Sequence, residues 1–368
     1  MRSNRIFKFI ARLCRLVLAC TFVFSGFTKV IDPWGTSLKV NEYLSIYGLD
    51  YLQGASMAFS IWLCGAELMM GCMLLFKVRI RLISIFALLS MTFFTVLTLL
   101  SATFLPVEDC GCFGEAVKLT PWQTFFKNLA LLPLAVVVWW RYRPDKIFAF
   151  NAVEIALTCS FFIMSMYLGY YCYRHLPLID FLPYKVGVNI REAMQEFETE
   201  TDAAETVLVY RNRRTGKLQE FSLDDTRWQD GDEWEWVDTR ISGDVPAVRS
   251  MIGEFALHDA EGDATEQVLS TPGRLYMLCV TRFDRLSRRC ARRMELLAAA
   301  AAEQGAEVVC LTPDPLHDRM WHMFGGQRVR CYNIDASTMK TMLRARNGLV
   351  VLDDGTISAK MNCRDIRP

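Results

Sequence analysis

Two cysteines one residue apart, Cys110 and Cys112, are the residues of this sequence that most directly suggest chemistry. They lie in the segment Asp109-Cys110-Gly111-Cys112-Phe113-Gly114. A direct Cys110–Cys112 bond would close a very small ring, and a strained disulfide of that kind is easily reduced, which makes it an oxidant. Gly111 supplies the backbone freedom that such a ring needs. The alternatives are a purely structural role and a pairing of each thiol elsewhere, with Cys172 or with a cysteine of the C-terminal half.

A carboxylate within an apolar run is the second candidate. Glu67 stands in the segment Leu63-Cys64-Gly65-Ala66-Glu67-Leu68. A charge in the hydrocarbon core is costly unless it is paired or neutralised, so such a residue is a functional candidate by default. Lys29, at the outer end of the first apolar run, is the obvious partner, and the small side chains of Ser25-Gly26 before it allow a neighbouring helix to approach. The pair is either a polar clamp between two helices or a group that handles protons or substrate.

Five apolar runs must position these residues. Each is long enough to cross the ~30 Å hydrocarbon core, which takes about 20 residues; they are residues 13–31, 56–76, 82–104, 122–140 and 149–172. No small-residue cleavage site follows the first run, so we interpret it as a retained span and not as a signal peptide. Thr120 as cap, Pro121 at the first helical position and Gln123 three residues after the cap predict where the fourth helix begins. The predicted fold is a membrane helical bundle of about five transmembrane helices, followed by an α/β domain.

The basic residues predict the orientation of this bundle. They cluster before the first run, between the second and third, and between the fourth and fifth, at Arg2, Arg5, Lys8, Arg12, Arg15, Lys77, Arg79, Arg81, Arg141, Arg143 and Lys146. We therefore expect a multi-pass protein of the cytoplasmic (inner) membrane, embedded in the lipid bilayer, with a cytoplasmic N-terminus. With five spans, the C-terminal domain is extracytoplasmic. Beyond His175 the chain has 25 Lys and Arg against 31 Asp and Glu, which argues against a nucleic-acid partner.

The C-terminal half changes from apolar runs to alternating strands and helices. We expect the transmembrane domain to cover residues 1–175, a linker with a small β-rich segment to cover 176–249, and the α/β domain to cover 250–368. A hairpin is predicted at 206–210 and 218–223. The α/β order that follows favours a small mixed sheet, with strands at 275–280, 307–311 and 329–334, helices at 286–303, 316–324 and 337–344, and a closing hairpin at 349–352 and 356–361.

The membrane half resembles the DoxX/MauE group. The resemblance covers roughly residues 10–142 and rests on Ser25-Gly26-x-x-Lys29, Glu67, the Cys110-Gly111-Cys112-Phe113-Gly114 loop and the Trp122-Gln123-Thr124 helix start. MauE proteins are associated with maturation of the disulfide-rich methylamine dehydrogenase light chain, beside a thioredoxin-like partner. The resemblance implies thiol–disulfide work outside the cytoplasmic membrane, on a substrate that need not be connected with methylamine.

The C-terminal half looks like the TlpA/thioredoxin group. Residues 252–259 resemble the short strand that these domains carry before the core, and the βαβ order agrees. Where the family has Cys-x-x-Cys, this chain has Ser287-Arg288-Arg289-Cys290, and Arg346-Asn347-Gly348 stand where the cis-proline is expected. The neighbouring arginines and the helix N-terminus would favour the Cys290 thiolate, so Cys290 is a weak redox candidate. We expect a degenerate domain that binds a partner.

Together these features predict support of thiol–disulfide chemistry, or of redox-protein maturation, at the outer face through Cys110 and Cys112, with an extracytoplasmic client protein. The chain would then be a thiol–disulfide oxidoreductase, if it is an enzyme. The alternatives are a non-enzymatic scaffold or assembly protein and a small-molecule carrier built around Glu67 and Lys29. No histidine stands near the cysteine loop to complete a tetrahedral site, so no metal is predicted. No cofactor motif is evident, and a quinone is kept as a candidate.

Overall fold

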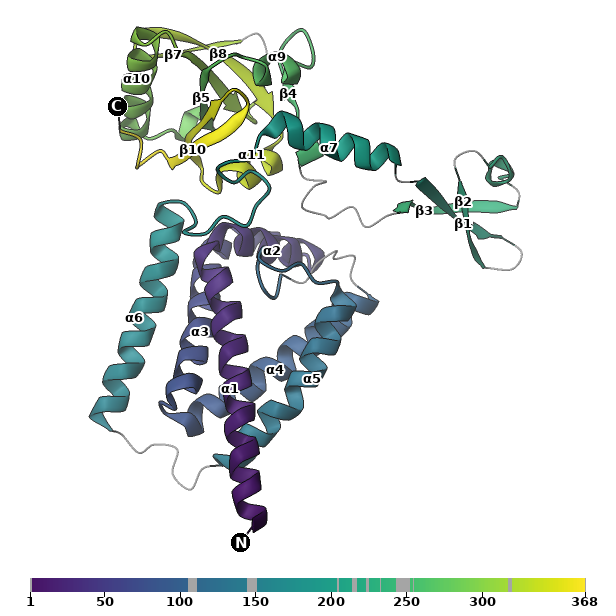
Figure 1. Cartoon of the computed structure of the whole chain (residues 1–368), viewed down its shortest axis with the longest axis vertical. Helices are drawn as coiled ribbons and strands as arrows, with labels where there is room; N and C mark the ends of the chain where they lie inside the picture. The colour runs from purple at the N-terminus through teal and green to yellow at the C-terminus, as the bar shows by residue number, and fades with distance from the viewer. Residues whose placement is uncertain are drawn as a thin grey trace. The chain divides into compact units, whose positions relative to one another are not determined.

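The structure is a computed structural model that describes residues 2–104, 111–143, 151–203, 205–213, 217–222, 225–231, 233–242, 252–253, 255–316 and 320–367. The chain divides into two compact units, Met1–Phe181 and Leu182–Pro368. The first is helical and the second contains two β-sheets (Figure 1).

Long helices build the first unit. They are α1 (Arg2–Ile31), α3 (Ser56–Phe76), α4 (Ile80–Thr103), α5 (Pro121–Arg141) and α6 (Ala152–Arg174), with the shorter α2 (Pro33–Ile46) and a 3₁₀ turn, η1 (Asp50–Ala55), between α1 and α3. Helix α2 was not predicted from the sequence. It begins at Asp32, whose carboxylate Oδ1 accepts a hydrogen bond from the Gly35 amide (3.0 Å), with Pro33 at the first helical position.

Four helices of the described residues are long and apolar enough to cross a membrane, namely Asp50–Phe76, Ile80–Thr103, Pro121–Arg141 and Ala152–Arg174. This corrects the predicted count of about five. The predicted first span, residues 13–31, lies within α1, which differs from these four helices in carrying six basic residues. The first unit is therefore a multi-pass membrane region.

The start of α5 follows the pattern predicted for it. The Thr120 hydroxyl accepts a hydrogen bond from the Gln123 amide (3.3 Å), and the Gln123 side chain accepts one from the Thr120 amide (3.0 Å). This reciprocal pair occupies two backbone donors that the first turn of a helix otherwise leaves without a partner. The start of α5 is thus fixed next to the cysteine loop, which precedes it in the chain.

Helices α1 and α3 pack with their backbones in contact at two glycines. A Cβ atom on Gly26 would lie 2.4 Å from the backbone nitrogen of Leu68, and one on Gly71 would lie 2.5 Å from that of Val23. No side chain fits at either position without moving a backbone. Small residues allow such close crossings of membrane helices, and here the crossing holds one face of α1 directly against α3.

The second unit contains a small antiparallel sheet of three strands, in the order β2-β1-β3. Strands β1 (Glu205–Asn212) and β2 (Leu218–Ser222) form the predicted hairpin, whose predicted turn lies partly outside the described residues. Strand β3 (Trp234–Ser242) was not predicted and pairs with β1. Helix α7 (Ile190–Ala203), also not predicted, precedes this sheet in the chain.

The larger sheet of the second unit has seven described strands, six of them in the order β10-β9-β5-β6-β8-β4, with β7 on β8. Strand β5 (Arg274–Val280) is parallel to β6 (Glu307–Thr312), and β6 is parallel to β8 (Gln327–Ile334). The remaining strands are antiparallel to their neighbours: β4 (Leu257–His258), β7 (Trp321–Phe324), β9 (Asn347–Asp353) and β10 (Thr356–Asn362). Helices α10 (Arg288–Glu303) and α11 (Ala336–Leu343) and the short α9 (Thr265–Leu269) complete this α/β fold.

The prediction of a helix at residues 316–324 was wrong. Residues Trp321–Phe324 form β7, which pairs with β8 across Gly325 and Gly326. Both glycines have positive φ angles, 56° and 88°, a conformation that glycine adopts at little cost and that tight hairpins require. The tight turn at these two glycines therefore places residues 321–324 alongside β8, where they pair as a strand.

Candidate functional site

The predicted partners Lys29 and Glu67 lie together between α1 and α3. Lys29 Nζ forms an ion pair with Glu67 Oε2, and Ser25 Oγ lies 2.6 Å from Glu67 Oε1. Ser25 and Lys29 are one helical turn apart on α1, so both side chains project from the same face of that helix. All three residues are at least nine-tenths buried. The carboxylate is thus neutralised on one oxygen and hydrogen-bonded on the other, as a charge inside a membrane requires.

The cysteine loop is attached to this buried cluster. The backbone carbonyl oxygen of Cys112 lies 2.5 Å from Ser25 Oγ, the same hydroxyl that contacts Glu67. Gly114 lies close against α1, because a Cβ atom there would be 3.3 Å from the Thr28 carbonyl oxygen. Gly114 has a φ of 56°, which also favours glycine. The backbone around Cys112 is therefore held on α1.

Aromatic and cationic contacts hold the next residue of the loop. The Phe113 ring packs edge-on against the Phe24 ring of α1, with centroids 5.4 Å apart. Lys127 Nζ of α5 lies 4.1 Å from the Phe113 ring centroid, within the range of a cation–π contact. The loop is thus anchored to two helices, while Cys112 itself is partly buried. Cys110 lies outside the described residues.

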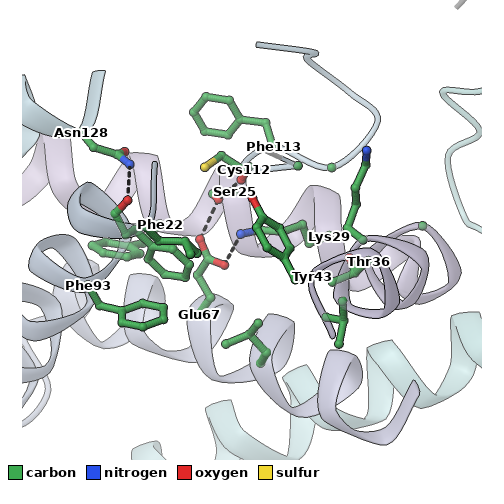
Figure 2. A pocket seen from close by; sticks show the side chains of 18 of the residues that line it. Phe22, Ser25, Lys29, Thr36, Tyr43, Glu67, Phe93, Cys112, Phe113 and Asn128 are labelled. Atoms are coloured by element: carbon green, nitrogen blue, oxygen red, sulfur yellow. Dashed lines mark hydrogen bonds and ion pairs between the residues drawn. The ribbon is translucent and has the colours of Figure 1, made fainter. Parts of the chain in front are cut away.

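A pocket of about 320 Å³ opens beside this cluster (Figure 2). Its walls come from α1, α2, α3, α4, α5 and the loop, and Cys112, Lys29 and Glu67 all line it. Rings supply much of the apolar surface, from Phe22, Tyr43, Phe59, Phe93, Phe94 and Phe113. The amide of Asn128, also on the wall, is held by long hydrogen bonds to the Phe94 carbonyl and the Thr98 hydroxyl. An apolar pocket with a few fixed polar groups is the usual form of a small-molecule site.

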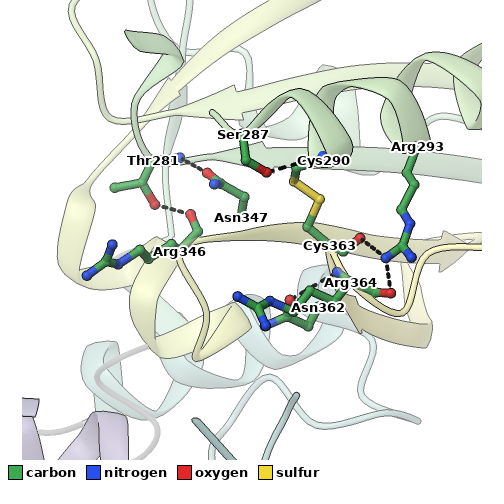
Figure 3. Close-up of a disulfide and its surroundings, with 9 residues drawn as sticks. All are labelled: Thr281, Ser287, Cys290, Arg293, Arg346, Asn347, Asn362, Cys363 and Arg364. Atoms are coloured by element: carbon green, nitrogen blue, oxygen red, sulfur yellow. Dashed lines mark hydrogen bonds between the residues drawn. A yellow bond between two sulfur atoms is a disulfide. The ribbon is translucent and has the colours of Figure 1, made fainter. Parts of the chain in front are cut away.

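Cys290 has a partner that the sequence analysis missed. It forms a disulfide with Cys363, 73 residues further along the chain, with a Cα–Cα distance of 5.7 Å (Figure 3). Cys290 lies in the first turn of α10, where Ser287 caps the helix and accepts a hydrogen bond from the Cys290 amide (3.3 Å). Cys363 follows β10, and Arg293 Nη1 donates to its carbonyl oxygen (3.2 Å). This partner lies far outside the Ser287-x-x-Cys290 motif.

Three further cysteines of the α/β unit lie inside strands and are buried. They are Cys279 on β5, Cys310 on β6 and Cys331 on β8. Burial raises the pKa of the Cys279 thiol to about 12. Cys310 stands opposite Cys331 in the parallel register, and its hydrogen bond with Cys331, together with burial, raises its pKa. Thiols with raised pKa values are poor nucleophiles, so Cys279 and Cys310 are packing groups of the core.

The alternative of a disulfide between the cysteine loop and Cys172 is not seen among the described residues. Cys172 is fully buried on α6 and packs with Val30 and Cys64. No group of three or more His, Cys, Asp or Glu side chains in the described part of the chain is placed to hold a metal ion.

The comparisons with known proteins agree with a membrane region of this kind. Residues 7–141 match the family described as Methylamine utilisation protein MauE, so the first unit contains a MauE-type membrane region. The chain is also similar to Protein TlpB of Flavobacterium psychrophilum, with 29% identity over 160 residues, 41% of this chain and 43% of that protein. The chain thus spans less than half the length of this curated relative. No solved structure matches.

Two residues of the site were missed as chemical groups. Ser25 was predicted only as a small residue at a helix crossing, whereas its hydroxyl contacts both Glu67 and the cysteine loop. Asn128 was not among the predicted site residues. A polar side chain in an apolar run is itself a signal of function, and that rule would have indicated Asn128.

Proposed function

We propose that this protein supports thiol–disulfide chemistry for the maturation of redox proteins outside the cytoplasmic membrane, with Cys110 and Cys112 as the reacting pair. The observation that carries the proposal is the contact of Ser25 with both Glu67 and the Cys112 carbonyl. It attaches a two-cysteine loop to the buried polar cluster of a MauE-type region. A structural disulfide would not need such an anchor in the core of the bundle.

The reaction that we infer is exchange between a Cys110–Cys112 disulfide and two thiols of a client protein. A client thiolate attacks one loop sulfur, forming a mixed disulfide and releasing the other loop cysteine as a thiolate. The second client thiolate then attacks the mixed disulfide, which leaves the client oxidised and both loop cysteines reduced. Two electrons pass from the client to the loop, and the two client protons end on the loop thiols or in solvent.

For the second unit we propose a thioredoxin-like domain that binds the client. Its support is the strand order β10-β9-β5-β6, with α10 between two parallel strands and Ser287-x-x-Cys290 at the N-terminus of α10. A Ser stands where the family has its first cysteine, and Cys290 is buried in a disulfide with Cys363. The domain therefore lacks an exposed pair for exchange, which favours binding over catalysis.

We also propose an N-terminus in the cytoplasm and an α/β unit outside it, on the basis of the clustered basic residues. The four helices that are long and apolar enough to cross a membrane would by themselves leave both ends on one side. The proposed orientation therefore adds α1 as a further crossing, which its close glycine contacts with α3 favour. A reporter enzyme that works only outside the cytoplasm, fused after Pro368, should be active, and external protease should remove the second unit. A protected second unit would refute the orientation.

Trapping of mixed disulfides in intact membranes tests the function. In Cys110→Ser or Cys112→Ser the remaining loop thiolate can still attack the disulfide of an oxidised client, the reverse of the exchange above, and no second loop thiol is present to release the adduct. One of the two variants should therefore accumulate a client adduct that reductant releases. The double variant should form none. Cys20→Ser, which removes an exposed cysteine of α1, is the matched control and should behave as the wild type. An adduct that persists in the double variant but disappears with Cys290→Ser would place the chemistry in the second unit and overturn the proposal.

A further inference from the structure

The pocket beside Cys112 has features that select its ligand. It is lined by three cationic side chains, Lys29, Lys39 and Lys127, and by three carboxylates, Asp32, Glu67 and Glu115. Two of these charges, Lys29 and Glu67, already neutralise each other. A pocket without excess charge favours an uncharged ligand, because a bound ion would lack a counter-charge in a low-dielectric site.

The walls favour a flat and lipid-soluble molecule. Phenyl rings of α1, α4 and the loop surround the space, at Phe22, Phe93, Phe94 and Phe113, and aromatic rings stack favourably with one another. Figure 2 shows Cys112 and Phe113 on one side of the pocket, with Asn128 and Lys29 on either side of Glu67. The N–H groups of the Asn128 amide already donate to Phe94 and Thr98. The ammonium groups of the lysines on the wall each have three N–H donors, which suit a ligand that carries carbonyl oxygens.

We propose that this pocket binds a quinone, which accepts the electrons of the cysteine loop. The inference rests on the proposed function, since a loop that oxidises a client is left reduced and needs an acceptor. In the balanced step the Cys110 and Cys112 thiols lose two electrons and two protons, and the S–S bond forms as both S–H bonds break. The quinone takes up both electrons and both protons and becomes a hydroquinone. Cys112 lines the pocket, so the loop and the acceptor share one site.

The volume agrees with a quinone head group. Small-molecule pockets usually measure about 300–1,000 Å³, and about 320 Å³ is at the lower end of that range. Such a space accommodates a substituted ring, and an attached isoprenoid chain would extend out of the pocket among apolar helices. The carrier would then reach the site from the bilayer.

The test uses the full chain in nanodiscs of phosphatidylcholine, with decyl-ubiquinone as the probe. Its binding should raise the melting temperature of the wild type. Leu97→Trp, which fills part of the pocket from α4, should weaken binding by about tenfold or more, equal to 1.4 kcal/mol. Leu99→Trp on the exposed face of the same helix is the matched control and should bind as the wild type does.

A second measurement concerns electron transfer. Reduced wild-type protein mixed anaerobically with decyl-ubiquinone should consume one quinone for each loop disulfide formed, whereas Cys112→Ser should consume none and still bind the probe. Equal binding by the wild type and Leu97→Trp, or binding without quinone reduction, overturns the inference. The inference is also overturned if phospholipid occupies the pocket and decyl-ubiquinone cannot displace it. If client trapping succeeds and the quinone tests fail, the proposed function stands and only the acceptor is wrong.

Discussion

The Cys290–Cys363 disulfide should supply a large part of the stability of the α/β unit. It closes a loop of 73 residues, for which the loss of chain entropy in the unfolded state corresponds to about 4 kcal/mol at 25 °C. Both cysteines are more than nine-tenths buried, in the core cluster that also contains Met294 and Leu349. We therefore expect Cys290→Ala with Cys363→Ala to lower the free energy of unfolding by about 2–4 kcal/mol, the range usual for native disulfides.

The assay is pulse proteolysis of the purified full chain across a urea series, with a C-terminal tag to report on the second unit. Reductant should lower the unfolding midpoint of the wild type to near that of the double variant and should leave the double variant unchanged. Cys310→Ala, in the same core cluster but outside the disulfide, is the control: it keeps the disulfide, so reductant should lower its unfolding midpoint as it does in the wild type. A wild type whose midpoint does not move when reductant is added would refute the reasoning.

Three further predictions concern other parts of the chain. Glu67→Gln leaves Lys29 as an uncompensated buried charge and should destabilise the protein by about 3–5 kcal/mol; Lys29→Met in the same chain should partly restore the melting temperature, and additive effects would contradict the pairing. Gly71→Ala places a Cβ 2.5 Å from a backbone nitrogen of α1 and should cost about 1–3 kcal/mol in thermal unfolding, whereas Gly54→Ala, with no atom within 4 Å, should be neutral. Asp335 caps α11, and hydrogen bonds from the neighbouring hydroxyl and amides lower its pKa. Its removal in Asp335→Ala should cost about 1 kcal/mol at pH 7. Because a lowered native pKa stabilises the fold above the unfolded-state pKa, this difference should shrink as the pH falls through the native pKa, and a difference that persists in acid would contradict the argument.

The sequence predicted most of the first unit because its signals are local. Apolar runs indicated the membrane helices, and the Thr120–Gln123 capping box indicated where α5 begins. Helix α2 was not predicted because it is short and has no strong apolar face. The charged pair was found because charges are rare in membrane helices. Its link to the cysteine loop through Ser25 depends on residues 87 positions apart, so no local pattern could reveal it.

In the α/β unit the errors have two physical causes. The hairpin signal Gly325-Gly326 was overlooked, although two adjacent glycines favour a tight turn. As a result β7 was predicted as a helix. The Cys290–Cys363 bond was missed because cysteine connectivity is set by the folded chain and cannot be deduced from sequence. Strands β5 and β6 are short apolar runs and β8 alternates polar with apolar residues, which explains why all three were predicted nearly as they are.

The shared contact at Ser25 has a consequence that follows from counting hydrogens. A serine hydroxyl has one hydrogen, yet its oxygen lies within 2.6 Å of two acceptors, Glu67 Oε1 and the Cys112 carbonyl. Because Glu67 is ion-paired with Lys29, its carboxylate is an acceptor, and only one of the two acceptors can receive that hydrogen. The carboxylate of α3 and the backbone of the cysteine loop therefore compete for a single hydrogen on α1.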